Sequence, residues 1–592
     1  MRIRVLVAAV IASALLVPVA SAQVTRHVPA QHASIQAAIV ASANGDTVLV
    51  APGVYLERID FLGKAITVRS SGGALATAID ANQTGTVVTF ANGEGPASVL
   101  EGFTVRGGLG VSAIVGGIEC QGTSPTIRAC TITGNRGSAG SPTGFASGGV
   151  GGIYATATAL RLIDCEVSGN FGGDGTSNAI LSGNGGVGGI QITTAPGFGT
   201  PVFERVRVIG NRGGVGGNGI ASPFGSGHGG CGGFQMFGLG GTVVLRQCEL
   251  RGNDGGAGGV GNGGAGALTI TGDTSIVVTW IGFTNCVITN NRGGAGGSSA
   301  TSVGGSGGGV FTSGNIAILG LHTTIAGNDA GLPVAAGQVT GGFVVGGSVF
   351  ASSNLSNCIL WGNTRAGAPS DLLVVGIAVV ANTCVIGASS SPVNGTGNLS
   401  VDPQFVNLAT GDVHLTAASP CRHAGSAGAA LVPFDFEGDP RVVGPAPDIG
   451  ADEFDLLPGT REDFTLALTI NGVADPAVTP VAGPAGALAS KSLRSPQGTL
   501  ANDFTVLLLE VWTPPVPPLP SAAYPGLQLP VTAPWFVVLP SGVGAAGSNI
   551  ANIANVVPPG LSGMVVRLQG VVVSLAAKNG SYATTAARDV IL

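Results

Sequence analysis

The chain has 592 residues, of which 103 are glycine, 9% are charged and 44% are hydrophobic, with a formal net charge of −6. A chain of this length exceeds one compact domain unless its fold is a repeat, and its abundance of Val and Ile argues against disorder. The sequence has no basic stripe that would suit nucleic acid, and beyond the N-terminus no uninterrupted apolar run long enough to span a membrane.

Residues 1–22 have the features of a secretory signal peptide. Arg2 and Arg4 form a basic region, residues 5–19 are apolar, and the small residues 20–22 suit a cleavage site. We therefore expect export from a bacterial cell, with the mature chain beginning at Gln23 and residing at the cell surface or in the extracellular space. We expect no transmembrane segment in the mature chain.

Residues 32–70 predict a capping element and a first coil. The stretch Ile35–Ile39 has a helical period, with Ser34 as a candidate N-cap, and Thr47–Val50 is typical of a strand. A helix is expected here because the open end of a solenoid exposes apolar side chains and unpaired backbone groups.

A block of 20 to 26 residues then recurs seven times, which indicates one coil of a β-solenoid per block. Each block opens with Gly-Gly or Gly-Ala and closes on a strand of the form X-x-[VIL]-x-x-Asn. Alternation along that strand places X and the third residue on one face, so stacked coils should align both as core ladders. The asparagines should form a turn ladder, because Asn tolerates left-handed backbone and stacked amides can hydrogen-bond. The openings are Gly116, Gly151, Gly188, Gly232, Gly266, Gly308 and Gly341; the asparagines are Asn135, Asn170, Asn211, Asn253, Asn291, Asn328 and Asn363; X is Cys130, Cys165, Val206, Cys248, Cys286, Thr323 and Cys358.

Gly-rich stretches always follow the asparagine, so the variation in coil length is concentrated at one corner. In repeat proteins such insertions lie on one face, often the binding face. Each stretch carries a single charged side chain, and we interpret the arginines that recur at one coil position as structural or solvated. These side chains are Arg136, Asp174, Arg212, Asp254, Arg292 and Asp329.

The pattern decays after Asn363, with a last strand near Cys384. A different segment occupies residues 398–455, and residues 456–592 form a third region, rich in Pro and without Cys. Apolar runs in that third region predict a separate β-rich domain, with a sandwich as the expected architecture.

Two of these segments resemble known proteins. Ile35-Gln36-Ala37-Ala38-Ile39, followed by Gly45-Asp46-Thr47-Val48 and by the Gly-Gly-Ile…Cys-x-Ile-x-Gly-Asn coils, resembles right-handed parallel β-helix proteins of the pectin-lyase-like superfamily. Residues 402–454 resemble the tail of choice-of-anchor surface proteins through Asp-Pro-x-Phe, Gly-Asp-x-x-Leu, Ser-Pro and Asp-Ile-Gly-Ala-x-Glu-Phe, although residues 421–423 depart from that pattern.

The resemblance covers about residues 32–455. It implies an all-β chain: a right-handed parallel β-helix with an N-terminal capping helix over residues 23–455, including the choice-of-anchor-like tail at 398–455, followed by a small β-sandwich-like domain at 456–592. That superfamily includes lyases, hydrolases, adhesins and inert surface proteins, so the resemblance implies a fold and leaves the activity open.

One outward-facing stripe follows the Gly-Gly openings and is a candidate ligand-binding face. Its first four members are polar or amphipathic, as a glycan-binding face would be, and the alternative is an ordinary solvated sheet face. The four residues are Glu119, Tyr154, Gln191 and Gln235, and Thr269, Phe311 and Val344 continue the stripe.

A carboxylate set in the tail is the candidate metal site, with Ca²⁺ as the ion. The alternative is that these aspartates pair with Arg441 or cap strands. The set is Asp435, Asp439, Asp448 and Asp452. A Gly-His-Gly at His228 is similar to a motif of β-helix polygalacturonases, but the paired aspartates that glycoside hydrolysis needs are missing around it, so we assign no catalytic residue.

The nine cysteines leave two interpretations open. Stacking one coil apart brings neighbouring cysteines within disulfide range, and export permits the bond, but parallel Cβ vectors favour buried thiols. The candidate pairs are Cys130–Cys165, Cys248–Cys286 and Cys358–Cys384.

From the sequence we therefore expect an exported, non-enzymatic surface or extracellular protein that binds polysaccharide, acts as a monomer and needs no cofactor. The alternatives are a polysaccharide lyase or glycoside hydrolase on the β-helix, and an adhesin.

Overall fold

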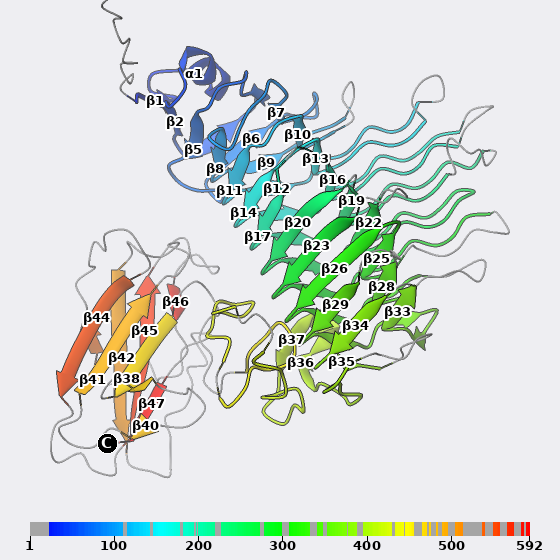
Figure 1. Ribbon diagram of the computed structural model, residues 1–592. Helices are drawn as coiled ribbons and strands as arrows, with labels where there is room; N and C mark the ends of the chain where they lie inside the picture. Colours follow the sequence, from blue (N-terminus) through cyan, green and yellow to red (C-terminus); the bar gives the residue numbers. More distant parts are fainter. Residues whose placement is uncertain are drawn as a thin grey trace, which may run out of the picture.

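The structure is a computed structural model of the chain (Figure 1). It describes the strands between residues 465 and 591, and most of residues 23–454. The predicted signal peptide, residues 1–22, lies outside the described residues. The gaps within 23–454 are 111–114, 142–145, 178–181, 195–196, 198, 220–226, 239, 273–277, 299–306, 332–339, 347–351, 376, 387–394, 429–431 and 443.

Successive coils build three parallel sheets, and every strand except the first and last of each sheet pairs with the strand one coil before and one coil after it. The chain visits sheet A, then sheet B, then sheet C, and returns to sheet A. The predicted parallel β-helix is therefore confirmed.

Sheet A has 12 strands and contributes an inward ladder of large apolar side chains. Phe203, Leu245, Phe283, Gly320 and Leu355 stand in register along it. The strands are β1 (Thr25–Val28), β2 (Thr47–Val50), β5 (Thr67–Ser70), β8 (Val99–Glu101), β11 (Thr126–Arg128), β14 (Arg161–Ile163), β17 (Val202–Glu204), β20 (Gly241–Arg246), β23 (Thr279–Thr284), β26 (Ile316–Leu321), β29 (Ser353–Ser356) and β34 (Ala378–Ala381).

Sheet B has 11 strands and carries both predicted core ladders. The X residues and the third residues, from Cys130 and Ile132 to Cys358 and Leu360, are buried in all seven coils, as predicted. The strands are β3 (Gly53–Tyr55), β6 (Thr77–Asp80), β9 (Thr104–Arg106), β12 (Thr131–Thr133), β15 (Glu166–Ser168), β18 (Arg207–Ile209), β21 (Glu249–Arg251), β24 (Val287–Thr289), β27 (Thr324–Ala326), β30 (Ile359–Trp361) and β35 (Cys384–Val385).

Sheet C has 10 strands, and each of them from β10 to β28 begins at or just after a Gly-Gly or Gly-Ala opening. Cβ atoms have no room at several of these openings; one built at Gly233 would lie 2.4 Å from the carbonyl oxygen of Ala267. The strands are β4 (Ile59–Asp60), β7 (Val88–Phe90), β10 (Ile118–Gln121), β13 (Ile153–Thr156), β16 (Ile190–Thr194), β19 (Phe234–Gly238), β22 (Leu268–Gly272), β25 (Val310–Ser313), β28 (Phe343–Gly346) and β33 (Leu372–Val375).

The predicted N-terminal helix is present as α1 (Ile35–Ala41). Ser34 is its N-cap, since the Ser34 hydroxyl accepts a hydrogen bond from the Ala37 N–H at 3.1 Å. Glu57 also accepts from the Ile35 and Gln36 amides, at 2.8 and 2.9 Å. The buried side chains of Ile35 and Ile39 join the solenoid core, so the helix caps it as expected.

The ladder asparagines are buried and linked from coil to coil. The Asn253 side-chain amide donates to Val208 O of the preceding coil and to Asn291 Oδ1 of the next, at 2.8 and 2.9 Å. The residue with left-handed backbone is the one before the asparagine, for example Gly252 at φ 61°. The expectation that the asparagine itself adopts left-handed backbone is therefore wrong. The preceding residue makes the turn, and the asparagine side chain hydrogen-bonds to the neighbouring coils.

A second left-handed position recurs at the corner between sheets A and B, directly before each X residue. Non-glycine residues occupy it at φ between 46° and 55°, which is uncommon backbone for them. The series is Ala129, Asp164, Arg205, Gln247, Asn285, His322 and Asn357.

The described parts of the Gly-rich stretches form a double layer between sheets B and C. An outgoing leg leaves each ladder asparagine and a return leg leads back to sheet C; in one coil these are residues 212–217 and 227–231. Along the outgoing leg, Gly213 N–H and Gly216 N–H donate to Asp254 O and Ala257 O of the next coil, both at 2.9 Å. Hydrogen bonds to one neighbour every third residue are typical of packed polyproline II helices, whose backbone groups all point outward.

Close packing explains the glycine content of these legs. Gly214 N–H donates to Gly186 O in the return leg of the preceding coil at 2.9 Å, and Gly230 N–H donates to Gly214 O at 2.8 Å. A Cβ atom at Gly230 would lie 1.9 Å from Gly186 O, although the φ of Gly230 is outside the left-handed range. The stretches lie at one corner, as predicted, but their described parts are packed layers in which only Gly fits at the inward positions.

The described parts of residues 402–454 pack on the outward face of sheet B over the last coils. β36 (Phe405–Asn407), the 3-10 helix η1 (Leu408–Thr410) and β37 (Asp412–Leu415) form a hairpin. Val413 and Ala451 pack against Val287 of β24. The corner residues Gln247 and Asn285 donate to Asp435 O and Phe434 O at 2.7 and 2.6 Å, so the tail is docked along the solenoid.

Beyond the tail, strands pair mostly antiparallel in two sheets, in the orders β39-β38-β41-β44 and β40-β47-β45-β42-β43, with β46 beside β45. The packing of these sheets as a sandwich stays a prediction. Within the described residues, no helix is long and apolar enough to cross a membrane. The strands are β38 (Thr465–Ile470), β39 (Val473–Ala474), β40 (Val481–Ala482), β41 (Leu488–Arg494), β42 (Phe504–Trp512), β43 (Phe536–Val538), β44 (Asn549–Val556), β45 (Val565–Val573), β46 (Tyr582–Thr584) and β47 (Arg588–Ile591), and outside these sheets β31 (Thr364–Arg365) pairs with β32 (Ala368–Pro369).

Candidate functional site

The predicted stripe lies on the outward face of sheet C, and the structure brings its members together. Glu119 of β10 stands beside Tyr154 of β13, which stands beside Gln191 of β16, and Gln191 stands beside Gln235 of β19. All four side chains are partly exposed. We call this row the sheet C stripe. Thr269 and Phe311 continue it in register, but Thr269 is buried, and so is Val344, the last residue expected in the stripe.

A second outward row runs parallel to the stripe, two residues further along each strand. It is polar apart from one aromatic side chain, and it is partly exposed throughout, or exposed at Gln121. Together the two rows give a continuous surface of amide, hydroxyl and aromatic groups. The second row is Gln121, Thr156, Thr193, Phe237, Thr271 and Ser313.

The return legs extend this surface beyond the sheet. Tyr154 packs against a buried row of Val150, Val187, Cys231 and Ala265. Three residues earlier in each leg comes a polar row in which each backbone amide donates to the preceding side chain, for example His228 N–H to Asn184 Oδ1 at 3.0 Å. A three-residue period keeps both rows on one side of the legs. The polar row is Ser147, Asn184, His228 and Asn262.

The stripe carries little charge. Burial and the nearby Glu119 carboxylate raise the pKa of Tyr154, so its hydroxyl stays protonated. Burial lowers the pKa of His228, and its Nδ1 accepts from the Asn262 N–H at 2.7 Å, so the ring is neutral. Of the stripe residues from Glu119 to Phe311, Glu119 is the single carboxylate, and this row therefore lacks the carboxylate pair that glycoside hydrolysis needs.

A carboxylate cluster with arginines lies on the outward face of sheet B, away from the stripe. Arg207 bridges Glu166 and Glu249 at 2.8 and 2.9 Å, and Arg251 binds the other oxygen of Glu249 at 2.7 Å. Glu166 and Glu249 thus lie on a different sheet from Glu119. Both carboxylates are neutralised by arginine, so this face is a surface ion-pair network.

The four predicted metal ligands do not converge on one point. The Asp435 carboxylate is buried and accepts four backbone amides: Glu437, Gly438 and Asp439 on Oδ1, and Glu453 on Oδ2, at 2.9–3.0 Å. Asp435 therefore organises the tail loop, and its oxygens are turned toward amides rather than toward a cation.

Asp448 and Asp452 also serve the tail backbone. Asp448 accepts from the amides of His423 and Phe454 at 2.6 and 2.8 Å, and Asp452 accepts from the Leu415 amide at 3.1 Å. The structure places these aspartates in two separate groups with histidines, namely His414–Glu437–Asp452 and His423–Asp448–Glu453.

The first of these groups is a salt-bridge cluster around His414. Burial lowers the pKa of His414, but the Glu437 charge, the hydrogen bond to Asp412 and the Asp452 charge outweigh it and raise the pKa to about 11. His414 Nε2 lies 3.1 Å from Glu437 Oε1. A protonated imidazole cannot ligate a metal, so a cation bound here would have to displace the His414 proton.

All nine cysteines are free buried thiols, so the disulfide interpretation of Cys130–Cys165, Cys248–Cys286 and Cys358–Cys384 is not what the structure shows. Cys130 N–H donates to the Cys165 sulfur at 3.4 Å, an unbonded contact between stacked residues. Cys384 lies in one buried cluster with Cys421 of the docked tail, a neighbour the sequence spacing did not indicate. Burial raises the pKa of Cys231 and Cys358 to about 12, so both behave as inert core side chains.

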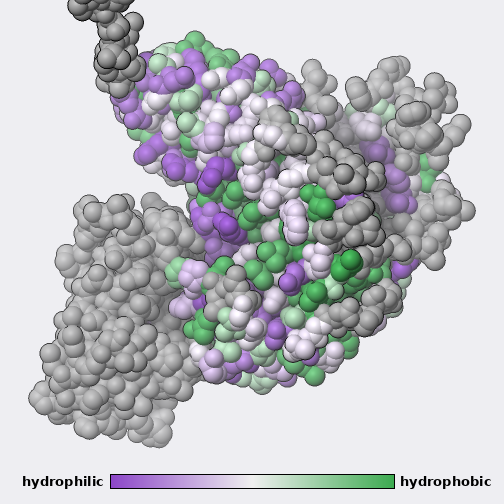
Figure 2. All heavy atoms as spheres, viewed as in Figure 1, coloured by the Kyte–Doolittle hydropathy of each residue, from purple (hydrophilic) through white to green (hydrophobic). Residues whose placement is uncertain are grey.

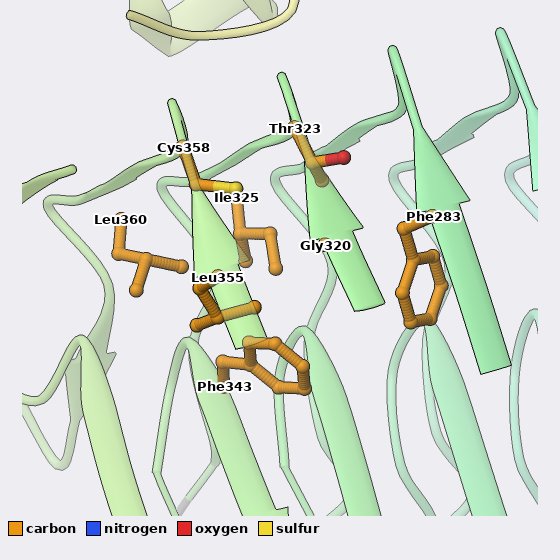
Figure 3. Close-up of a pocket in the computed structure, with 8 residues that line it drawn as sticks. All are labelled: Phe283, Gly320, Thr323, Ile325, Phe343, Leu355, Cys358 and Leu360. Carbon is orange, nitrogen blue, oxygen red and sulfur yellow. The ribbon is translucent and has the colours of Figure 1, made fainter. Parts of the chain in front are cut away.

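A cavity among the described residues lies inside the solenoid and has an almost wholly apolar lining. It occurs where Gly320 interrupts the inward ladder of sheet A, between Phe283 and Leu355 (Figure 3). Thr323 is the one polar side chain in its lining, and its hydroxyl donates to Leu321 O at 3.0 Å. The cavity is therefore a packing defect.

The outward face of sheet A exposes a hydrophobic area that the sequence analysis did not single out. Figure 2 shows hydrophobic residues gathered over β23, β26 and β29 and hydrophilic ones over the earlier coils. Trp280 is 47% exposed, Leu319 43% and Val379 41%. The alternation in Thr279–Thr284 was the available signal for Trp280, since it places Trp280 opposite the buried Ile281 and Phe283.

A scan against models of protein families and a search of the curated proteins both find no match to this chain.

Proposed function

We propose that the chain is an exported, non-enzymatic surface or extracellular protein that binds an extended polysaccharide along the sheet C stripe. The observation that carries the proposal is the in-register row of Tyr154, Gln191 and Gln235. Export, the right-handed sense of the helix and membership in the pectin-lyase-like superfamily, with a tail of the choice-of-anchor type, are part of the same proposal and rest on the sequence features given above.

The stripe suits a neutral or weakly charged sugar polymer. Sugars are recognised by amide and hydroxyl hydrogen bonds and by contact with aromatic rings, and both rows of sheet C present these groups. Strands repeat at about 4.8 Å along the axis, and a pyranose unit of an extended chain is about as long as one such step. Each coil would therefore face one sugar unit with equivalent side chains.

A polysaccharide lyase or glycoside hydrolase is the second candidate. It would need a carboxylate pair, or a carboxylate with a free basic group. The sheet B cluster of Glu166, Arg207 and Glu249 has these residue types, but they form ion pairs with one another. An adhesin would use the same sheet C stripe with a host or neighbouring-cell glycan as its ligand.

Glycan-array binding of the purified protein, with a lyase and hydrolase assay on every polymer that binds, tests the proposal. Tyr154→Ala and Gln191→Ala should each weaken binding about ten-fold, the loss expected of one aromatic or hydrogen-bonding contact. Trp280→Ala on sheet A is the matched control and should bind normally. Loss of binding only in Trp280→Ala would move the site to sheet A, and polymer cleavage that stops in Glu166→Gln would replace binding with catalysis.

A further inference from the structure

The outgoing legs carry a row of side chains that stack one coil apart, directly after the ladder asparagines. Parallel backbone bridges link Arg212 to Asp254, Asp254 to Arg292, and Arg292 to Asp329. Arg212, Asp254 and Arg292 are exposed and Asp329 is partly exposed. The charges therefore alternate in sign over four consecutive coils; we call these four residues the charge row.

The charged groups of this row are available to a binding partner. Within the described residues, none of Arg212, Asp254 and Arg292 makes an ion pair, in contrast to Arg136, which lies 3.8 Å from Asp174 at the start of the same face. Phe171, next to Arg212 in the stack, is 45% exposed. Three residues after Arg212, Asp254 and Arg292 come side chains that are small enough for a partner to approach closely: Val215, Ala257 and Ala295.

The alternating signs of the charges restrict which partner can bind the row. A polyanion or polycation would meet a like charge at every second coil, so neither matches the row. A second copy related by a two-fold axis between Asp254 and Arg292 presents the same four charges at the same spacing in reverse order. Arg212 then faces Asp329 of the second copy, and Asp254 faces its Arg292, so all four contacts join opposite charges, as an isologous interface requires.

We propose that this face is the contact between two copies of the chain, arranged as an antiparallel two-fold dimer through the charge row. The dimer goes beyond the polysaccharide-binding proposal and replaces the monomer expected from the sequence. The outgoing legs form the contact, whereas the stripe lies on sheet C and stays available to ligand.

Sedimentation analysis of the purified full chain over a range of concentrations tests the dimer, because association through exposed charges should weaken as salt is raised. Asp254→Arg sets like charges against each other twice in the dimer and should weaken association at least ten-fold. The single variant Arg292→Asp is compared with Arg161→Asp, which makes the same change of charge at an exposed arginine on sheet A. Arg161→Asp should associate normally.

The double variant Asp254→Arg/Arg292→Asp separates the dimer from a role within one chain. Its row reads plus, plus, minus, minus, which is again complementary to a two-fold copy, whereas neighbours within the chain become like-charged. Recovery of the dimer in this variant supports the proposal. A wild-type chain that is monomeric throughout, or a dimer that ignores Asp254→Arg, overturns it.

The neutral pair Asp254→Asn/Arg292→Gln covers the case in which the swapped chain fails to fold. It places no like charges side by side, and it should lower association without any recovery; unchanged association would overturn the proposal.

Discussion

The side-chain amide of Asn363 donates to Asp371 Oδ1 at 2.9 Å, and the Asn363 backbone N–H donates to the same oxygen at 2.8 Å. Asp371 thus occupies the place of the next asparagine and ends the ladder. Its side chain is fully buried, and burial raises its pKa from 3.8 to about 6 against the opposing effect of the Asn363 hydrogen bonds.

Replacing Asp371 with Asn should stabilise the protein at pH 7 and flatten its pH dependence. A raised carboxyl pKa means that the folded state binds the proton more tightly, so the contribution of this group falls as pH rises from about 4 to about 6. Asp371→Asn keeps the hydrogen-bond acceptor without the charge and should raise the free energy of unfolding by about 2 kcal/mol at pH 7. Denaturant unfolding at pH 4 and pH 7 measures the gain, with Asp402→Asn as an exposed control; an equal pH slope in the wild-type and Asp371→Asn proteins would contradict it.

Removing one rung of the asparagine ladder should cost far more than removing an exposed asparagine. Asn253→Ala deletes the donors to Val208 O and Asn291 Oδ1 and the acceptor for Asn211, which leaves several buried groups unpaired. We expect a loss of about 3 kcal/mol or more in the free energy of unfolding. Asn218→Ala, at an exposed position, should change it by less than about 0.5 kcal/mol. Similar losses for both would show that the ladder is dispensable.

Two glycines distinguish crowding from backbone strain. A Cβ atom at Gly230 would lie 1.9 Å from Gly186 O, whereas Gly252, at φ 61°, has open space around it. Gly252→Ala should lower the free energy of unfolding by about 1–2 kcal/mol. Gly252→Asn should lower it by less, because Asn290 holds the equivalent position in the next coil at φ 54°.

Gly230→Ala should cost more than either Gly252 variant and disturb the adjoining legs, as hydrogen exchange of the Gly214 amide would report. Equal stability of Gly230→Ala and Gly252→Ala would refute the packed double layer.

The His414 cluster should make the docked tail sensitive to alkali. Because the folded pKa of about 11 lies above the ordinary value of 6.5, the stabilisation is complete below pH 6.5 and is lost as pH rises toward 11. Each pH unit above 6.5 should cost about 1 kcal/mol. Hydrogen exchange of the Leu415 amide between pH 6.5 and 9.5, corrected for intrinsic rates, measures this loss; His414→Gln should abolish the pH dependence, and His27→Gln, at an exposed position, should leave it intact.

The repeat made the solenoid and its ladders predictable, because both depend on a regular alternation that a short strand must obey. From Cys130 to Leu360 the inward positions could be assigned from spacing, and so could the neighbours on the sheet C stripe. The glycine layer was missed because Gly-rich sequence usually marks irregular turns. Its signal was the recurring Gly-Gly-x triplet, with Val150, Val187 and Cys231 at the same phase.

The docking of the tail could not be inferred from the tail alone. The signal was on the solenoid, where the outward row of sheet B changes from Glu249 to Val287 and Ile359, and where the left-handed corner changes to amide side chains such as Asn285. These substitutions have meaning only once the register between coils is known. The aspartates were misleading for the same reason, since their amide partners come from turns that the sequence does not define.

The glycine layer also bears on how the molecule comes apart. A solenoid unravels one coil at a time, and the cost of each step depends on the bonds to the adjacent coil. Bonds such as Gly216 N–H to Ala257 O and Gly229 N–H to Asn262 O join neighbouring coils in addition to those of the three sheets. Neighbouring coils in the middle of the solenoid are therefore held together by more hydrogen bonds than those at its ends. Unfolding that starts at either end should stop when it reaches the coils with long glycine legs.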